Sequence, residues 1–425
     1  MIKILKYGVI ASEEIFARGT SARDVSGVVA EIIQNVKNNG DMAVKEYCFK
    51  FDGAALDSLK VSEREIKDAI NSVQPKFLRI LRQAAKNIRA FHKKQVRKGF
   101  TIKKSNGVIL GQKITPIEKV GLYVPGGTAA YPSTVLMDAI PALIAGASEI
   151  VMVTPPDKNG KINSAILAAA SVAGVTKIYK VGGAQAIAAL AFGTESIPRV
   201  YKIVGPGNAF VAEAKKQVFG QVSIDMIAGP SEIMIVSDGK SDPTFVAADL
   251  LSQAEHDKMA SAVLITDSEE LAIKVQAEIE RQLPLLLRKD IARVSIDDNG
   301  KIIVVKNLDQ AIEIANEIAP EHLELCVDEP IDYLDKVKNA GSVFLGRSCP
   351  EALGDYFAGP NHTLPTSGTA KFSSPLSVDD FIKKTQFTFY TEDALSKVAN
   401  KVAYFAKKEG LTAHAKSATV RSEKK

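Results

Sequence analysis

From residue 119 onward, short strand-like runs alternate with helical stretches, and this alternation constrains the fold more than any other feature of the sequence. The runs are Val120–Val124, Ile150–Val153, Ile178–Val181, Tyr201–Val204, Ile233–Val236, Ala262–Ile265, Ile302–Val305 and Leu323–Val327. Strands that alternate with helices form βαβ units, in which helices cover both faces of a mostly parallel sheet. These units are too many for one small sheet. We therefore expect two α/β domains, with a seam near Ala228–Ser231.

The chain outside this region has other patterns. Val28, Ile32 and Val36 recur at helical spacing, and helical patterns continue through most of the first hundred residues. Residues 100–118 alternate like two short strands around a turn. The last fifty residues, after Leu376, read as a separate helical segment.

Composition narrows the class of protein. The 425 residues are 46% hydrophobic and 24% charged, which is typical of a soluble globular protein. The three cysteines have no CxxC spacing, which argues for a reducing compartment and against a disulfide framework or a thiolate zinc cluster. We expect no signal peptide, no membrane span and no nucleic-acid partner, because the start lacks a long apolar run and the lysines are scattered. A cytoplasmic location follows.

Three glycine turns follow predicted strands. They are Pro125-Gly126-Gly127, Gly182-Gly183 and Gly205-Pro206-Gly207-Asn208-Ala209-Phe210. The sequence contains no GxxxxGK[ST] motif, and the third turn departs from GxGxxG at its last position, so the dinucleotide signal is weak. Each turn alone could be an ordinary tight turn. Together, at the carboxyl ends of strands, they favour a crevice for a small molecule or nucleotide.

The five histidines are more informative. His92 reads as a surface residue of a helix. Gln253 and His256 are three residues apart, a helical spacing that suits two ligands of one metal, although a histidine that stabilises a helix C-terminus explains His256 as well. Glu321-His322 is either an acid/base pair or an exposed loop pair.

A glycine-rich segment contains Asp355 and His362, and conspicuous polar residues in a long loop often mark a site. His414 lies near the C-terminus. Neutral imidazoles with a carboxylate suit zinc, whereas glutamine is an unusual zinc ligand. Covalent catalysis by a thiol is disfavoured, because Cys349 is the only cysteine expected in a loop.

Together, these motifs resemble the histidinol dehydrogenase family over essentially the whole chain and in the family's order. The matching segments are Val120–Gly127, Val181–Thr194, Gly205–Phe210, Ala228–Glu232, Asp249–His256, Pro320–Leu323, Gly341–Gly346, Gly354–Asp355, Asn361–Pro365 and Leu411–His414. The match does not depend on any one motif. It implies oxidation of L-histidinol, through L-histidinaldehyde, to L-histidine with two NAD, the last steps of histidine biosynthesis.

The resemblance also implies the residues of the site. One zinc ion per subunit would be bound by Gln253, His256, Asp355 and His414. NAD would contact Tyr123, Gln185 and Asn208. Substrate would contact Ser231, Gln253, His256, His322, Asp355, Glu409 and His414. His322 would act as general base on the alcohol, and Glu321 would activate the water that attacks the aldehyde. His362 falls in a matching motif without an assigned role.

The implied architecture is α/β, with two incomplete Rossmann-like parallel-sheet domains and small helical segments at both ends. The expected division is an N-terminal arm (1–20), a larger α/β domain (21–122 and 231–375), an inserted NAD-binding domain (123–230) and a C-terminal helical segment (376–425). The family is a homodimer with exchanged elements, so the C-terminal segment with Glu409 and His414 would complete the partner's site.

Two other functions remain open from the residues. A zinc hydrolase could use Glu321 or Glu255 as its base, with the glycine turns only structural. A binding or assembly protein of the same fold could have lost catalysis, but the intact Glu321-His322 pair and the four metal positions argue against it.

Overall fold

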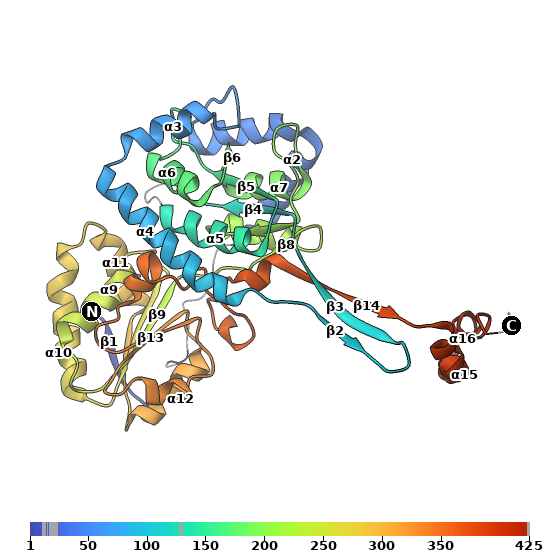
Figure 1. Cartoon of the computed structure of the whole chain (residues 1–425). Helices are drawn as coiled ribbons and strands as arrows, with labels where there is room; N and C mark the ends of the chain where they lie inside the picture. The colour runs from blue at the N-terminus through green and yellow to red at the C-terminus, as the bar shows by residue number, and fades with distance from the viewer. Residues whose placement is uncertain (11–13, 15, 17–23, 127–130, 423–425) are drawn as a thin grey trace. The chain divides into compact units, whose positions relative to one another are not determined.

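The computed structural model describes residues 1–10, 14, 16, 24–126 and 131–422. The chain divides into two compact units. The main unit contains Met1–Gln95 and Glu118–Phe381, and the small unit contains Val96–Ile117 and Ile382–Lys425. Both parallel sheets belong to the main unit (Figure 1). Within the described residues, no helix is long and apolar enough to cross a membrane.

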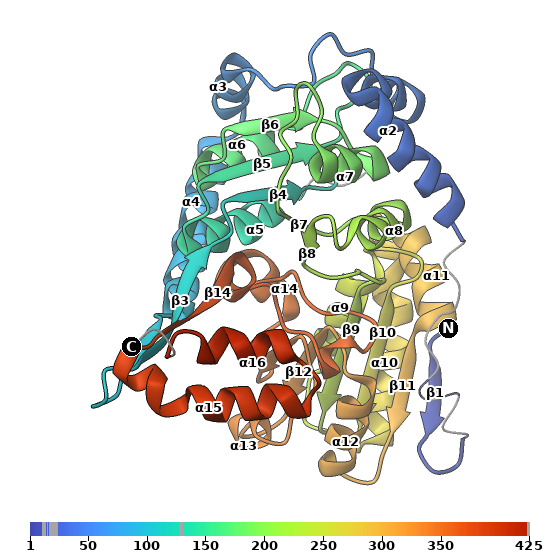
Figure 2. The same cartoon turned by 90° about the vertical axis from the view of Figure 1, so that its right-hand side faces the viewer.

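The first sheet of the main unit has five parallel strands in the order β6-β5-β4-β7-β8 (Figure 2). They are β4 (Lys119–Tyr123), β5 (Glu149–Thr154), β6 (Lys177–Lys180), β7 (Lys202–Val204) and β8 (Ser223–Ile224). The helices between them are α5 (Pro132–Ala145), α6 (Ser164–Ala173), α7 (Gly183–Phe192) and α8 (Ala209–Val218). Three N-terminal helices, α2 (Ser26–Tyr47), α3 (Glu63–Ser72) and α4 (Pro75–His92), pack against α7, α6 and α5 respectively.

The second sheet has six parallel strands in the order β1-β11-β10-β9-β12-β13. They are β1 (Lys3–Lys6), β9 (Glu232–Ser237), β10 (Ser261–Thr266), β11 (Lys301–Val304), β12 (His322–Cys326) and β13 (Ser342–Leu345). Alternate strand residues face opposite sides. One face packs on α9 (Pro243–Ala254), α10 (Glu269–Gln282) and α11 (Lys289–Asn299), and the other packs on α12 (Leu308–Ile318). The expected α/β fold with two parallel sheets is confirmed, and the predicted seam lies between them.

The small unit is an antiparallel sheet with a helical hairpin. Its strands are β2 (Phe100–Lys103), β3 (Ile109–Pro116) and β14 (Ile382–Phe389), in the order β14-β3-β2. Its helices are α15 (Glu392–Lys408) and α16 (Thr412–Thr419), which share a small alanine-rich core. The two strands expected over residues 100–118 are confirmed. The purely helical reading of the last fifty residues is wrong, because residues 382–389 pair with β3 along their whole length.

His92 is the other residue that the structure places differently. It is fully buried, although a surface position was expected. It continues the buried stripe of α4, one helical turn after Ile88. Its Nδ1 lies 2.9 Å from the Ile88 carbonyl, and its Nε2 lies 3.4 Å from the Asn361 amide nitrogen. His92 is therefore a core histidine with polar partners.

Candidate active site

The Glu321-His322 pair lies at the amino edge of the six-stranded sheet, where β12 begins. Both side chains are buried, which excludes an exposed loop pair. The Glu321 carboxylate accepts a hydrogen bond from the backbone N–H of Glu232 at 2.9 Å. His322 Nδ1 lies 3.0 Å from the Glu232 carbonyl oxygen. The first residue of β9 thus orients both side chains, and Ser231 directly precedes it, half-buried.

The contact with a carbonyl determines which nitrogen of His322 is reactive. A carbonyl oxygen can only accept, so Nδ1 must carry the proton and donate it. In the neutral ring, the lone pair is then on Nε2. That atom is buried and makes no hydrogen bond within the described residues, although Asp355 Oδ1 is 3.4 Å away. Nε2 is therefore available to a ligand, as a base or acceptor in the neutral ring and as a donor in the protonated ring.

A candidate metal centre lies beside this pair. One ligand atom from each of His256, Glu351 and Asp355 lies within 4.8 Å of the others. His256 follows the end of α9, while Glu351 begins the short helix α14 (Glu351–Leu353) and Asp355 lies in the π-helical turn η4 (Gly354–Ala358). With its amide oriented to satisfy its neighbours, Gln253 donates to the Glu351 carboxylate at 2.9 Å. An imidazole nitrogen with carboxylate oxygens is a donor set that fits zinc.

The electrostatics of the cluster favour a bound cation. Burial raises the pKa of Glu321 to about 7 and that of Glu351 to about 8. Burial also lowers the pKa of His256, which favours the neutral ring that binds metals. Burial would lower the pKa of His322, but the charges of Glu351, Glu321 and Asp355 raise it well above its usual value. A divalent cation would relieve this concentration of buried negative charge.

The expected metal ligands are only partly brought together. His256 and Asp355 meet in the cluster, and Gln253 joins it through Glu351. His414 lies exposed on α16, and Glu409 lies exposed directly after α15; both belong to the small unit. The structure thus groups three of the four expected ligands within the main unit.

Glu351 was missed by the sequence reasoning. It lies four residues before Asp355, and this spacing places two side chains on one side of a helical turn. That spacing is the signal that could have identified it. The structure also suggests what His362 does: its Nδ1 lies 3.1 Å from the Asp355 carbonyl oxygen, and its Nε2 lies 3.4 Å from Thr134 Oγ1. His362 therefore contacts the backbone of the acidic residue.

The residues expected to contact NAD lie at the carboxyl edge of the five-stranded sheet. The Tyr123 hydroxyl, at the end of β4, accepts a hydrogen bond from the backbone N–H of Gly183 at 3.1 Å. Gln185 is buried in the first turn of α7. Asn208 caps α8 by accepting from the N–H groups of its first turn. The turns at Gly182-Gly183 and Gly205–Asn208 each lie between a strand and a helix, as predicted. Gly127 of the first turn lies outside the described residues.

Helix α5 connects this edge to the cluster of His256, Glu351 and Asp355. The amide of Asn361 donates to the Met137 carbonyl at 2.7 Å, and Thr363 Oγ1 donates to Asp138 Oδ1 at 3.0 Å. Between these two residues lies His362, which contacts Asp355. The segment that supports the acidic cluster is therefore bound to a helix of the five-stranded sheet.

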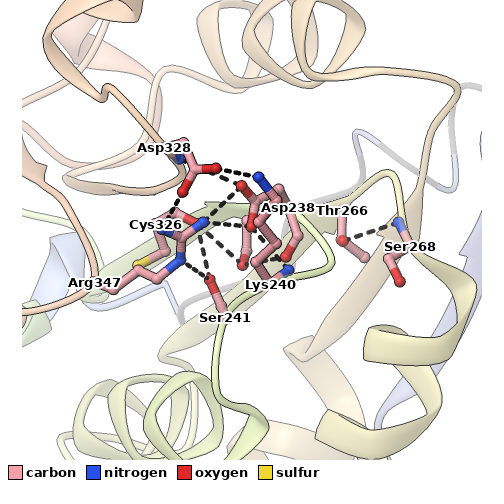
Figure 3. Close-up of polar contacts among 9 residues, drawn as sticks. Asp238, Lys240, Ser241, Thr266, Ser268, Cys326, Asp328 and Arg347 are labelled. Carbon is pink, nitrogen blue, oxygen red and sulfur yellow. Dashed lines mark hydrogen bonds and ion pairs between the residues drawn. The ribbon is translucent and has the colours of Figure 1, made fainter.

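The carboxyl edge of the six-stranded sheet is occupied by side chains. Arg347 donates to both Asp238 oxygens at 2.6 Å and to Asp328 at 2.7 Å (Figure 3). Its Nε donates to Ser241 Oγ at 3.1 Å, and Lys240 pairs with Asp328. Two anions and two cations balance one another there. Ligands of open α/β sheets usually bind at the carboxyl edge, but in this sheet the Glu321-His322 pair lies at the amino edge.

Two of the three thiols are unsuited to nucleophilic catalysis. Cys48 and Cys326 are buried, and burial raises the pKa of Cys48 to about 12 and that of Cys326 further. Buried thiols with raised pKa values are poor nucleophiles.

Known proteins share both sequence and fold with the chain. A family model described as Histidinol dehydrogenase matches residues 17–422. Histidinol dehydrogenase from Clostridium acetobutylicum is 54% identical over 426 residues, with 99% of each chain covered. Histidinol dehydrogenase from Geobacillus kaustophilus is 56% identical over 396 residues, with 93% of each covered. The crystal structure of histidinol dehydrogenase from Elizabethkingia anophelis superimposes with a TM-score of 0.94 at 40% identity, covering 99% of this chain and 98% of that one.

Proposed function

Since the chain belongs to the histidinol dehydrogenase family, we propose that it oxidises L-histidinol, through L-histidinaldehyde, to L-histidine. Two NAD accept the two hydrides, and one water supplies the second carboxylate oxygen. The observation that carries the proposal is the buried Glu321-His322 pair beside the cluster of His256, Glu351 and Asp355. Such a pair supplies the proton transfers of both oxidations, and the cofactor carries the hydrides.

In the first oxidation, His322 Nε2 takes the hydroxyl proton of histidinol while hydride leaves the same carbon for NAD. Nε2 has no hydrogen-bond partner among the described residues, and a bound cation would offset the charges that raise the pKa of His322, which would favour the neutral ring that can take this proton. In the second oxidation, Glu321 removes a proton from the water that attacks the aldehyde, and hydride leaves the hydrate. Its pKa of about 7, raised by burial, suits a group that gains and loses a proton near neutral pH.

We place the zinc ion at Gln253, His256, Asp355 and His414, with Glu351 beside it. The buried imidazole and carboxylate donors support this position. A bound zinc would anchor the imidazole and amine of the substrate and so orient the reacting carbon. Ser231 lies beside Glu232 at the start of β9, where it can contact the substrate.

We place NAD at the carboxyl edge of the five-stranded sheet, in contact with Tyr123, Gln185 and Asn208. The N-termini of α7 and α8 follow glycine turns there, and helix N-termini attract phosphate groups. Gly183 and Gly205 have φ values of 66° and 119°, which favour glycine and leave the backbone open to close approach. We retain residues 123–230 as the NAD-binding domain and residues 21–122 with 231–375 as the larger domain.

We propose a cytoplasmic homodimer in which residues 376–425 complete the partner's site, with residues 1–20 as an arm. The small unit exposes large apolar side chains on both its sheet and its helices, among them Phe389 (54%), Tyr404 (66%) and Phe405 (69%). Surfaces of this kind mark protein contacts. Glu409 and His414 lie exposed on the same unit.

The test is NADH formation from histidinol. We expect two NADH per histidinol consumed, loss of activity after chelation, and recovery when zinc is added. Protein that is fully loaded with zinc but forms no NADH from histidinol would refute the proposal. Hydrolysis of an ester or amide without NAD would instead favour the hydrolase.

A further inference from the structure

Next to the cluster, two carboxyl side chains that the mechanism does not use contact each other. Glu324, in the middle of β12, is buried, and Asp249 on α9 is half-buried. The two groups are in hydrogen-bond contact. Glu324 Oε1 also accepts a hydrogen bond from the backbone N–H of Glu351 at 2.7 Å. One buried side chain therefore joins a strand and two helices.

We propose that Glu324, with Asp249, is a positioning residue that holds the elements carrying the metal cluster in register. Glu324 and His322 are two residues apart and project from the same face of β12. Asp249 lies one helical turn before Gln253 on α9. Glu351 contributes its backbone N–H, four residues before Asp355. We call the contacts of Glu324 with Asp249 and with the Glu351 N–H the junction. β12, α9 and α14 thus each supply one group to the junction.

The junction matters most for α14. This helix is short, and the N–H groups of its first turn have no partner within the helix. Glu324 satisfies the first of them, so its carboxylate sets where Glu351 begins the turn that leads to Asp355. Without this acceptor, α14 could shift along the sheet, and misplacement of ligands by a few tenths of an ångström weakens a metal site.

Amide substitution separates hydrogen bonding from charge. In Glu324→Gln, the amide oxygen can still accept from Glu351, and the amide nitrogen can donate to Asp249. Glu324→Leu keeps a similar volume but removes both interactions. Leu325→Val is the matched control, because Leu325 is buried on the opposite face of β12, toward α12. It weakens the same strand without touching the junction.

The experiment measures the dissociation constant of zinc by competition with a chelator, with the melting temperature and the kcat and KM for histidinol at saturating zinc. We expect Glu324→Leu to weaken zinc binding at least tenfold and to raise KM, Glu324→Gln to stay within twofold of wild type, and Leu325→Val to lower only the melting temperature. If Glu324→Leu does not fold, Glu324→Met, which also removes the acceptor of the Glu351 N–H, carries the same expectation.

The inference rests on the proposed metal site, and the two can fail separately. Wild-type protein that binds no zinc refutes both the metal site and the positioning role. Wild-type protein that binds zinc, with Glu324→Leu binding it within twofold, overturns the positioning role alone. Equal weakening by Glu324→Leu and Leu325→Val would also overturn it, because the effect would then follow general stability.

Discussion

Replacing Lys215 by methionine should destabilise the protein strongly. Lys215 and Asp225 form an ion pair whose side chains are only 2% and 1% exposed. Lys215 Nζ also donates to the Gly205 carbonyl at 2.9 Å, and Asp225 Oδ2 accepts from the Gly205 N–H at 2.8 Å. The pair thus binds both the N–H and the carbonyl of Gly205, which lies in the turn proposed to approach NAD.

The size of the stability loss in Lys215→Met depends on the buried charges that remain after the substitution. Burial, and next the charge of Asp225, raise the pKa of the nearby Asp138 to about 8, so this carboxyl is mostly neutral at pH 7. Lys215→Met therefore leaves Asp225 as a buried anion without its counterion. Removing one partner of a buried pair costs about 3–5 kcal/mol. The double variant with Asp225→Asn should recover much of that loss, because no buried charge remains.

The assay is urea unfolding at pH 7, which gives the free energy of unfolding. Lys216→Met is the matched control: Lys216 is next along α8, is 61% exposed and pairs with Glu213. An exposed pair contributes at most about 1 kcal/mol. The reasoning is refuted if Lys215→Met loses no more stability than Lys216→Met. It is equally refuted if adding Asp225→Asn causes a further loss of similar size.

Glu321→Gln should keep the oxidation of histidinol to the aldehyde but slow the oxidation of supplied histidinaldehyde by about 10²–10⁴-fold, the usual value of acid–base catalysis; equal rates for both steps would contradict the role of Glu321. Burial raises the pKa of Asp138 from its usual 3.8 to about 8, so the free energy of unfolding should fall as pH rises from about 4 to 8. Asp138→Asn should flatten that slope in urea unfolding at pH 5 and pH 8, and an unchanged slope would show that another group causes it. His414→Ala and His322→Ala should each be inactive as homodimers but regain activity when unfolded and refolded together, because a mixed dimer would contain one intact site. Absence of complementation, with mixed dimers present, would contradict the exchange of elements.

Periodicity predicted the fold well, because a buried parallel strand produces an apolar run that few other structures produce. Eight strands of the two parallel sheets lie where the apolar runs indicated, whereas β1, β8 and β13 were not predicted. The pattern was uninformative for β14, where Lys383, Lys384 and Gln386 interrupt the apolar residues and pairing with the distant β3 determines the structure. His92 was misjudged for a related reason: its neighbours Lys93 and Lys94 are exposed, but its own position continues the buried stripe.

The candidate site was less accessible to local reasoning. Spacing alone favoured a structural reading of His256 and of the Glu321-His322 pair, and only the resemblance favoured the functional reading. Glu351 could have been identified from its spacing to Asp355, but Glu324 could not, because its role depends on β12, α9 and α14 meeting in space. The position of Glu321 and His322 at the amino edge of the six-stranded sheet was also not predicted, because the general rule for open α/β sheets favours the carboxyl edge.

The pairing of β14 with β3 has a consequence for synthesis on the ribosome. The β2–β3 hairpin leaves the ribosome about 270 residues before β14, a delay on the order of tens of seconds at ordinary elongation rates. During that interval, one edge of β3 has neither its native partner nor a protecting helix. Unpaired strand edges recruit other chains. A nascent chain of this protein therefore carries an unpaired strand edge in its first third. We expect chaperones or neighbouring nascent chains to bind at this hairpin.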